Sequence, residues 1–282
     1  MNYRHIYHAG NFADVFKHAL LALVVEYLTR KDKPFFVLDT HAGLGEYDLT
    51  ADEAQRTGEW RDGIGRILAE PDPPEALRPY LNAVRALGGG TPPSRYPGSP
   101  RIARHFMRPG DRLVASELHP EDASVLKGVF ARDGQSKVLE LDGYTALKAN
   151  VPPKERRGLV LMDPPFEQPD EFPAMVRALT AAFRKWPTGI YGLWYPVKGG
   201  GAVPAFQGEL ATAGLGDVLV AEMTVMPVDE STNRLNGTGM VLVNPPWTLE
   251  DTLNDLLPWL TRVLGRTDLG GGDWRLAWLS RK

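Results

Sequence analysis

At 282 residues and a formal net charge of −3, the chain is long enough for one large domain with an insertion, and it is too acidic to coat nucleic acid indiscriminately. It contains no cysteine, which excludes disulfides and thiolate metal sites and suits a reducing cytoplasm. The first residues, MNYRHIYHAG, contain no apolar stretch like that of a signal peptide. The apolar run at 19–28 is too short to span a bilayer. We therefore expect a cytoplasmic protein that has no membrane partner.

The apolar pattern then predicts a succession of helices and strands. Apolar residues at helical spacing indicate a first helix over 12–30, which ends in basic residues followed by Pro34. The run FFVLD at 35–39 is short, apolar and closed by an acid, as is typical of a strand buried on both faces. Comparable strand runs follow at 112–117, 137–142, 158–163, 189–194, 218–225 and 239–244, and helical patterns lie at 121–132, 170–185 and 249–264.

Strands that alternate with helices favour an α/β fold with a mostly parallel sheet covered on both sides. The last two strand runs are separated by a polar loop, so we expect them to form an antiparallel hairpin at one edge of the sheet. The gap between the first two strands is far longer than the roughly 30 residues of a simple strand–helix–strand step, so we expect a small helical insertion at about 46–95. We interpret residues 1–282 as a single domain that carries this insertion.

The segment DTHAGLGEY at 39–47 places an acid, Gly43 and Gly45 directly after the first strand. Such glycines allow a sharp turn and a close approach of a ligand to the backbone at the carboxyl end of the sheet. A dinucleotide motif would have a third glycine where this chain has Asp48, and no lysine follows to cradle phosphates. The segment favours a cofactor without a pyrophosphate, although alone it is equally compatible with an ordinary strand–helix turn.

Acids also close the next strands. Glu117 ends the second strand, where it is placed to accept hydrogen bonds from two ribose hydroxyls, and Asp142 ends the third, where it is placed to accept from the amine of an adenine. Either acid taken singly is more simply a solvated residue at a strand end. In the order Gly loop, Glu117, Asp142 and Asp163, however, they together predict a pocket for S-adenosylmethionine.

The fourth strand ends in DPPF, residues 163–166, a combination suited to methylating a planar amine. The Asp163 carboxylate and the rigid Pro164 carbonyl can accept both N–H bonds of an adenine amino group and turn its lone pair toward the methyl donor. Phe166 offers a flat face on which a flipped base can stack. No metal is required, because a sulfonium is already a good leaving group and the displacement depends on positioning. The simpler interpretation is that the prolines only terminate the strand.

A similar NPPW at 244–247 also follows an apolar strand. It lies on the expected edge hairpin, far from the Gly loop in sheet order. We therefore interpret it as structural, with Trp247 packing under the helix at 249–264, and choose DPPF as the working site.

The chain as a whole resembles the bacterial 23S ribosomal RNA adenine-N6 methyltransferases of the RlmJ type. The blocks that carry the resemblance extend over essentially the full length: YRHIYHAGNFADVFKH at 3–18, DTHAG at 39–43, YPGSP at 96–100, ELHP at 117–120, DPPF, WYP at 194–196 and NPPW. The resemblance implies a Rossmann-like class I S-adenosylmethionine-dependent methyltransferase sheet with a small helical insertion. It also implies an N-terminal substrate-facing motif at about 1–18 and methyl transfer to one adenosine of large-subunit RNA.

The resemblance further implies roles for single residues. Contacts with S-adenosylmethionine, which leaves as S-adenosylhomocysteine, fall on His18, His41, Ser99, Glu117, Asp142, Gly143 and Asp163. Asp163 is also the catalytic acceptor, and Tyr3 and Lys17 match positions that handle the RNA. One departure is Phe166, where the family commonly has tyrosine; stacking does not need the hydroxyl.

Viewed as residues alone, some of these positions have simpler interpretations. His18 is more simply a packed histidine, and Ser99 before Pro100 predicts the N-cap of a helix. Tyr3, Arg4, His5 and Lys17 form a basic and aromatic cluster suited to phosphate contact.

Two other functions stay open from the sequence. A DNA adenine methyltransferase would use the same chemistry, but no further target-recognition domain is recognisable. A noncatalytic RNA-binding protein on the same fold is disfavoured by the intact Asp163 and Gly43. We expect 23S ribosomal RNA as the partner, no obligate protein partner, and a monomer.

Overall fold

An eight-stranded sheet forms the centre of the computed structural model, which describes residues 4–88, 90, 93–229 and 231–281. Its strand order is β10-β8-β9-β7-β6-β1-β4-β5. Five neighbouring strands pair in parallel: β7 (Ile190–Val197), β6 (Gly158–Met162), β1 (Phe36–Asp39), β4 (Arg112–Glu117) and β5 (Ser136–Glu140). Since their carboxyl ends meet at one edge of the sheet, the residues that follow them are brought together.

The other three strands are antiparallel to their neighbours. β9 (Gly237–Val243) lies between β7 and β8 (Val218–Thr224), and β10 (Trp274–Ser280) pairs with β8. The predicted pairing of β8 with β9 is therefore confirmed, but its place at the sheet edge is wrong. β9 is inserted next to β7, and the edge strand is β10, which the sequence pattern did not predict.

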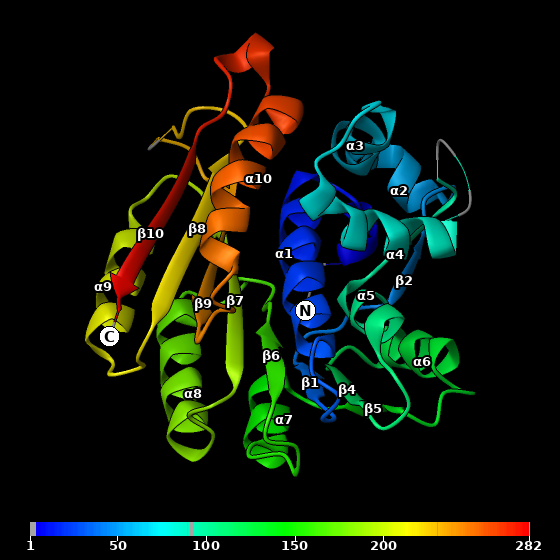
Figure 1. Cartoon of the computed structure of the whole chain (residues 1–282). Coiled ribbons are helices and arrows are strands. Elements are labelled where there is room, and N and C mark those ends of the chain that lie inside the picture. Colours follow the sequence, from blue (N-terminus) through cyan, green and yellow to red (C-terminus); the bar gives the residue numbers. More distant parts are fainter. Residues whose placement is uncertain (1–3, 89, 91–92, 230, 282) are drawn as a thin grey trace.

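Helices cover both faces of the sheet (Figure 1). The first face carries α1 (Phe12–Thr29), α5 (Ser99–Phe106), α6 (Pro120–Val129) and α10 (Leu249–Leu264), and the second carries α7 (Gly143–Asn150), α8 (Glu171–Lys185) and α9 (Ala202–Thr212). Successive residues of β1 follow the period of two, because Val37 packs into the first hydrophobic layer and Phe36 and Leu38 into the second. This two-sided burial explains why the parallel strands read as continuous apolar runs.

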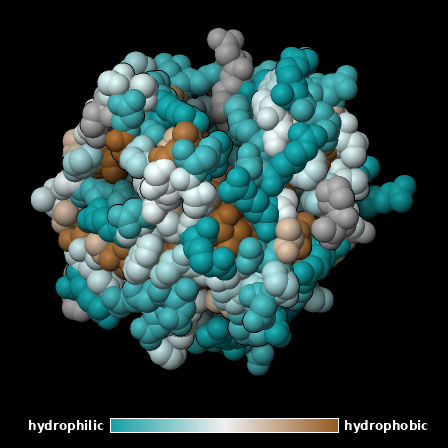
Figure 2. Space-filling view, turned by 90° about the horizontal axis from the view of Figure 1, so that it is seen from above, coloured by the Kyte–Doolittle hydropathy of each residue, from teal (hydrophilic) through white to brown (hydrophobic). Residues whose placement is uncertain are grey.

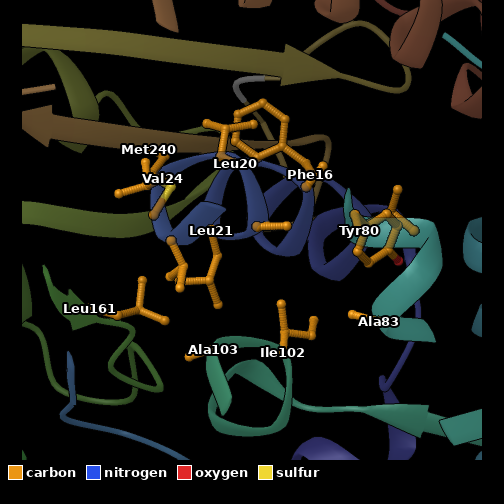
Figure 3. Close-up of a cluster of buried hydrophobic side chains, with 14 of the residues drawn as sticks. Phe16, Leu20, Leu21, Val24, Tyr80, Ala83, Ile102, Ala103, Leu161 and Met240 are labelled. Atoms are coloured by element: carbon orange, nitrogen blue, oxygen red, sulfur yellow. The ribbon is translucent and has the colours of Figure 1, made fainter. Parts of the chain in front are cut away.

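Helix α1 is buried on nearly all sides. Its residues Phe16, Leu20, Leu21 and Val24 are at most 1% exposed. Figure 3 shows them among side chains from four other elements, including Leu161 of β6. Asn11 caps its start by accepting from the backbone N–H groups of Ala13 and Asp14 at 3.0 Å each. The polar residues on this helix are therefore held in fixed positions inside the molecule.

The long segment between β1 and β4 contains short helices and a second, two-stranded sheet. Its elements are β2 (Glu46–Asp48), α2 (Asp52–Thr57), α3 (Arg66–Ala69), α4 (Arg78–Gly88) and β3 (Arg95–Pro97), with a π-helical turn before α3 and a 3₁₀ turn before α4. β2 and β3 pair antiparallel through the register Tyr47 with Tyr96. α4 packs on α1, which ties this segment to the main body.

The exterior offers no extended apolar face toward the viewer of Figure 2, where apolar groups lie in small separate patches among hydrophilic residues. Within the described part of the chain, no helix combines the length and apolar character needed to cross a membrane.

Candidate active site

A cavity of about 590 Å³ opens at the carboxyl edge of the parallel strands. Asp39, Glu117 and Asp163 lie at or just after the ends of β1, β4 and β6, and Asp142 begins the connection from β5 to α7. The cavity volume is in the range of small-molecule sites. Its lining takes in every described residue of the predicted site: Lys17, His18, His41, Gly43, Ser99, Glu117, Asp142, Gly143, Asp163, Pro164 and Phe166. Tyr3 lies outside the described residues.

Glu117 is held by the backbone of two loops. Its Oε2 accepts from the Gly43 N–H at 2.9 Å and its Oε1 accepts from the His119 N–H at 2.8 Å. Burial raises the pKa of Glu117, while the N–H groups of His119 and Gly43 act in the opposite sense. A carboxylate has about four acceptor sites, so each oxygen can take a further hydroxyl donor from the cavity.

Two glycines that line the cavity have no space for a side chain. Gly43 has a positive φ of 58°, and a Cβ there would collide with the Tyr47 hydroxyl. A Cβ on Gly143 would lie 2.7 Å from the His41 ring. Both positions therefore require glycine, the first for its backbone conformation and the second for close packing.

The Asp142 side chain has a local structural role as well as a place in the cavity. Its carboxylate accepts from the Thr145 N–H at 2.8 Å and so caps the start of α7. The predicted cap at Ser99 is wrong, because α5 begins at Ser99 itself with Gly98 at the N-cap and no capping side chain. The Ser99 hydroxyl instead lies beside Asp39.

Asp39 is almost fully buried behind the cavity wall. Its Oδ1 accepts from the His41 N–H at 3.3 Å, and its Oδ2 has no hydrogen-bond partner among the described residues. Burial raises the pKa of Asp39 to about 7, partly offset by the nearby Ser99 hydroxyl. Burial thus favours the protonated form of Asp39 up to near neutral pH.

Two histidines of the cavity, the buried His18 and the half-buried His41, are neutral. Burial lowers the pKa of His18 to about 3, although the Asp14 carboxylate acts in the opposite sense. Burial likewise lowers the pKa of His41 to about 4, against the carboxylates of Asp163 and Asp142. His41 is fixed by its Nδ1, which lies 2.8 Å from the Thr40 hydroxyl. Each ring therefore presents one N–H and one bare nitrogen at neutral pH.

Asp163 forms a buried ion pair with Lys17. The Lys17 Nζ lies 2.6 Å from Asp163 Oδ2 and 3.0 Å from Asp14 Oδ1. Burial alone would lower the pKa of Lys17, but the two carboxylates raise it well above its usual value. Asp163 Oδ1 and the Pro164 carbonyl accept no hydrogen bond from the described residues. The site thus presents two oxygen acceptors side by side in the chain.

The sequence did not single out Asp14, although it is central to these contacts. It lies one helical turn before Lys17 and His18 on α1, and this spacing was the available signal. Burial would raise the pKa of Asp14, but His5 and Lys17 lower it well below its usual value. Asp14 is therefore a buried carboxylate that holds the charge of Lys17 in place.

Aromatic rings border Phe166. Its ring centroid lies 4.9 Å from that of Phe172 and 5.9 Å from that of Trp194, which also lines the cavity. Phe166 has a left-handed backbone with φ of 52°, a strained conformation that non-glycine residues adopt mainly at functional sites and tight turns. The sequence pattern marked Trp194 only as part of the WYP block and assigned it no role in the site. Trp194 reaches the site because it lies on β7, next to β6.

The expected cluster of basic groups near the N-terminus is neutralised by acids in this structure. Arg4 pairs with Glu121 at 3.0 Å and Asp122 at 2.9 Å, and His5 pairs with Asp14 at 2.9 Å. Lys17 is buried and paired with Asp14 and Asp163. These contacts turn the cluster toward the cavity wall and leave no open row of cations for phosphate contact among Arg4, His5 and Lys17.

NPPW and DPPF lie at opposite ends of the strands. β9 runs antiparallel to β7 and β6 runs parallel to it, so the carboxyl ends of β9 and β6 point in opposite directions. The Asn244 amide donates to the carbonyls of Pro187 and Gly189 at 2.8 Å each. The expected packing of Trp247 under α10 is wrong, since Trp247 is 80% exposed. Only the strand-ending role of Asn244 agrees with the sequence-based interpretation.

Comparisons with known proteins identify relatives of this chain. The family model described as ribosomal RNA large subunit methyltransferase D, RlmJ, matches residues 32–280. The chain is 41% identical to ribosomal RNA large subunit methyltransferase J of Escherichia coli K12 and 40% identical to that of Haemophilus influenzae, each over 99% of both chains.

Solved structures show the same fold. A crystal structure from Legionella pneumophila has a TM-score of 0.87 at 32% identity and covers 96% of this chain and 98% of that chain. A spermidine synthase structure from Corynebacterium glutamicum, with a TM-score of 0.51 at 12% identity, is similar in fold alone; it covers 93% of this chain and 74% of that chain. The predicted class I methyltransferase sheet is confirmed, and the chain belongs to the RlmJ family of ribosomal RNA large subunit methyltransferases.

Proposed function

We propose that this protein transfers a methyl group from S-adenosylmethionine to the exocyclic N6 of one adenosine in 23S ribosomal RNA. The single observation that carries the proposal is the placement of the Asp163 carboxylate, Pro164 and Phe166 in the same cavity as Glu117 and Asp142. A ribosomal RNA methyltransferase follows from the family. The base, the atom and the RNA molecule are the finer part of the proposal.

The residues present fit S-adenosylmethionine. Glu117 is prearranged by two backbone N–H groups and keeps acceptor capacity for the two hydroxyls of a ribose. Asp142 lies on the neighbouring strand connection, where its remaining acceptor capacity suits an adenine amine. The glycines at 43 and 143 let the chain pack closely beside the cavity, where a Cβ would collide with neighbouring protein atoms. When bound, S-adenosylmethionine supplies an electrophilic methyl group on a sulfonium.

The protein then has to position a poor nucleophile. The N6 lone pair of adenine is delocalised into the ring, so two acceptors on its N–H bonds favour the pyramidal form that attacks. Asp163 Oδ1 and the Pro164 carbonyl are the two acceptors, and Phe166 with Trp194 forms an aromatic wall against which the base can stack. A base inside a helix cannot reach this cavity, so the adenosine must be unstacked or flipped out.

Lys17 fixes the geometry of the acceptor. Its ion pair with Asp163 Oδ2 holds the carboxylate in one orientation and leaves Oδ1 as the oxygen for a substrate N–H group. The second contact of Lys17, with Asp14, also holds the ammonium group in place. Prearranged acceptors of this kind require no reorganisation during the reaction.

The test is transfer of a tritiated methyl group to 23S RNA from cells that lack the enzyme, followed by mapping and nucleoside analysis of the labelled base. We expect one labelled N6-methyladenosine. Label on cytosine, on another position of adenine or on protein would contradict the proposal. Duplex DNA carrying the same sequence is the matched control, and transfer to DNA in place of RNA would reassign the substrate.

A further inference from the structure

A line of hydrogen bonds runs from the cavity into the segment between β1 and β4. His18 Nδ1, on α1, lies 2.7 Å from the Tyr96 hydroxyl, on β3. That hydroxyl lies 3.0 Å from the Tyr80 hydroxyl, on α4. Figure 3 shows Tyr80 on the side of α4 that faces α1. All three residues are at most 1% exposed, and His18 is the member of the line that borders the cavity.

The protons in this line decide which nitrogen of His18 carries hydrogen. The line contains two hydrogen bonds, and each needs one proton. If Nδ1 is bare, Tyr96 donates to it and Tyr80 donates to Tyr96, so both hydroxyl protons are used. If Nδ1 carries a proton, three protons share two bonds, and one buried donor has no acceptor among the described residues. With Nδ1 bare, the one proton without a protein acceptor lies on Nε2, in the ring that lines the cavity, where solvent or a ligand can accept it. With Nδ1 protonated, the donor without an acceptor lies in the packed interior, which is strongly disfavoured, so Nδ1 is bare.

A neutral imidazole with a bare Nδ1 carries its proton on Nε2. His18 is neutral because burial lowers its pKa to about 3. Its Nε2 lies 3.9 Å from Asp14 Oδ1, which is beyond hydrogen-bond distance, and that oxygen is already engaged by Lys17 at 3.0 Å. The Nε2–H group is therefore a donor available to a ligand in the cavity.

We propose that Tyr96 is a positioning residue whose hydroxyl holds His18 in the Nε2–H tautomer, ready to donate to an oxygen of the bound methyl donor. The identity of that ligand rests on the proposed function; the tautomer does not. Tyr80 is not required, because without its hydroxyl Tyr96 still has one proton to donate to one acceptor. Through Tyr96, the segment between β1 and β4 sets the chemistry of a residue in the cavity without touching the ligand itself.

The tautomer is measured directly by NMR on the protein labelled with ¹⁵N at its histidine rings. The ring nitrogens of a bare and a protonated position differ widely in chemical shift, and the chain has only six histidines. His18→Gln assigns the signal. We expect His18 to show a bare Nδ1 and a protonated Nε2 in the ligand-free protein. A proton on Nδ1 would overturn the proposal without reference to any substrate.

Two variants then test the role of Tyr96. The double variant Tyr80→Phe/Tyr96→Phe removes the line without stranding a hydroxyl, and Tyr80→Phe alone is the matched control. We expect the double variant to lose the single tautomer and to bind S-adenosylhomocysteine about tenfold more weakly by calorimetry, as for the loss of one hydrogen bond. Tyr80→Phe should keep both the tautomer and the affinity.

Each remaining outcome is decisive. A double variant that keeps the wild-type tautomer and affinity would show that Tyr96 does not position His18. Loss of the tautomer with unchanged affinity would show that the Nε2–H group does not donate to the ligand, and would overturn that part of the proposal. If the wild-type protein binds no S-adenosylhomocysteine at all, the proposed function fails, while the NMR result still decides the tautomer.

Discussion

At the scale of single residues, the site is organised around charges that are buried but paired. Lys17 lies between Asp14 and Asp163, and removing one partner of such a buried pair usually leaves an expensive uncompensated charge. Here Lys17 keeps a second carboxylate whichever one is removed. Asp163, the proposed catalytic acceptor, can therefore be replaced without leaving Lys17 unpaired, which allows a clean mutational test.

We expect Asp163→Ala to lower the rate of methyl transfer by at least about two orders of magnitude, because an acceptor and its positioning are lost. The measurement is single-turnover transfer to 23S RNA, with the folded state checked by thermal unfolding. Near-normal turnover would mean that the catalytic group lies elsewhere.

Asn244→Ala is the matched control at the second proline motif. Its amide donates hydrogen bonds to two backbone carbonyls, at the end of the strands away from the cavity. We therefore expect the variant to lose about 1–3 kcal/mol of stability and to keep an unchanged chemical step. Loss of the chemical step in folded protein would reverse the choice between the two motifs.

The raised pKa of Asp39 leads us to expect that the stability of the protein depends on pH. Its native pKa of about 7 exceeds the usual value near 3.8, so the native state binds the proton more tightly than the unfolded state. The contribution of Asp39 to the free energy of unfolding is therefore constant below about pH 4 and falls as the pH rises toward 7.

We expect Asp39→Asn to remove this fall. Relative to wild type, the variant should gain stability between pH 4 and pH 7, by on the order of a few kcal/mol. Denaturant unfolding of both proteins across this range is the measurement. Parallel stability curves for the two proteins would show that Asp39 is ionised throughout the range.

At the scale of elements, the strand ends and helix starts combine structural and ligand-facing roles. Asp142 caps α7 and borders the cavity, and Glu117 ends β4 while bonding the loop after β1. The same backbone N–H groups that stabilise these ends also orient the acids. A substitution that removes such an acid therefore mixes a folding effect with a binding effect, and the two must be separated.

For Asp142 the separation comes from two variants. We expect Asp142→Ala to lose about 1 kcal/mol of stability with the cap, together with affinity for S-adenosylhomocysteine. Asp142→Asn keeps a capping oxygen, so it should stay as stable as wild type and lose affinity alone. Thermal unfolding and calorimetry give the two quantities. An Asn variant that binds as tightly as wild type would remove Asp142 from the proposed ligand contacts.

At the scale of the whole molecule, the parallel strands of the sheet border the cavity and the antiparallel strands do not. The cavity lies over β7, β6, β1, β4 and β5, and the antiparallel strands β9, β8 and β10 extend the sheet beyond β7. β10 covers the edge of β8, and its Trp278 donates to Glu250 of α10 at 2.7 Å. The last strand therefore protects the sheet without contacting the site.

We expect removal of residues 274–282 to lower the unfolding temperature and to promote association, because the edge of β8 would be exposed. Affinity for S-adenosylhomocysteine in the folded fraction should stay at the wild-type value. Thermal unfolding, sedimentation and calorimetry are the measurements, and removal of 281–282 alone is the control. Unchanged solubility and stability of the shorter chain would show that β10 is dispensable.

Much of the fold could be read from local pattern. The continuous apolar runs and the helical spacings predicted the parallel strands and the helices α1, α6, α8 and α10 close to their observed bounds. The pattern did not predict β10, because its sequence, WRLAWLS, contains Arg275 among residues that are only half buried at the sheet edge. The pattern also did not predict that β9 lies inside the sheet, because strand order depends on contacts between segments that are distant in the sequence.

The same division holds for the site. The sequence by itself determined which acids and glycines follow the strands, because a strand ends where its apolar pattern ends. Only the tertiary structure decided that Lys17 of α1 reaches Asp163, that Tyr96 reaches His18, and that NPPW faces away from DPPF. The physical reason is that burial, pKa and ion pairing depend on which distant segments are packed together, and local pattern carries no record of that packing.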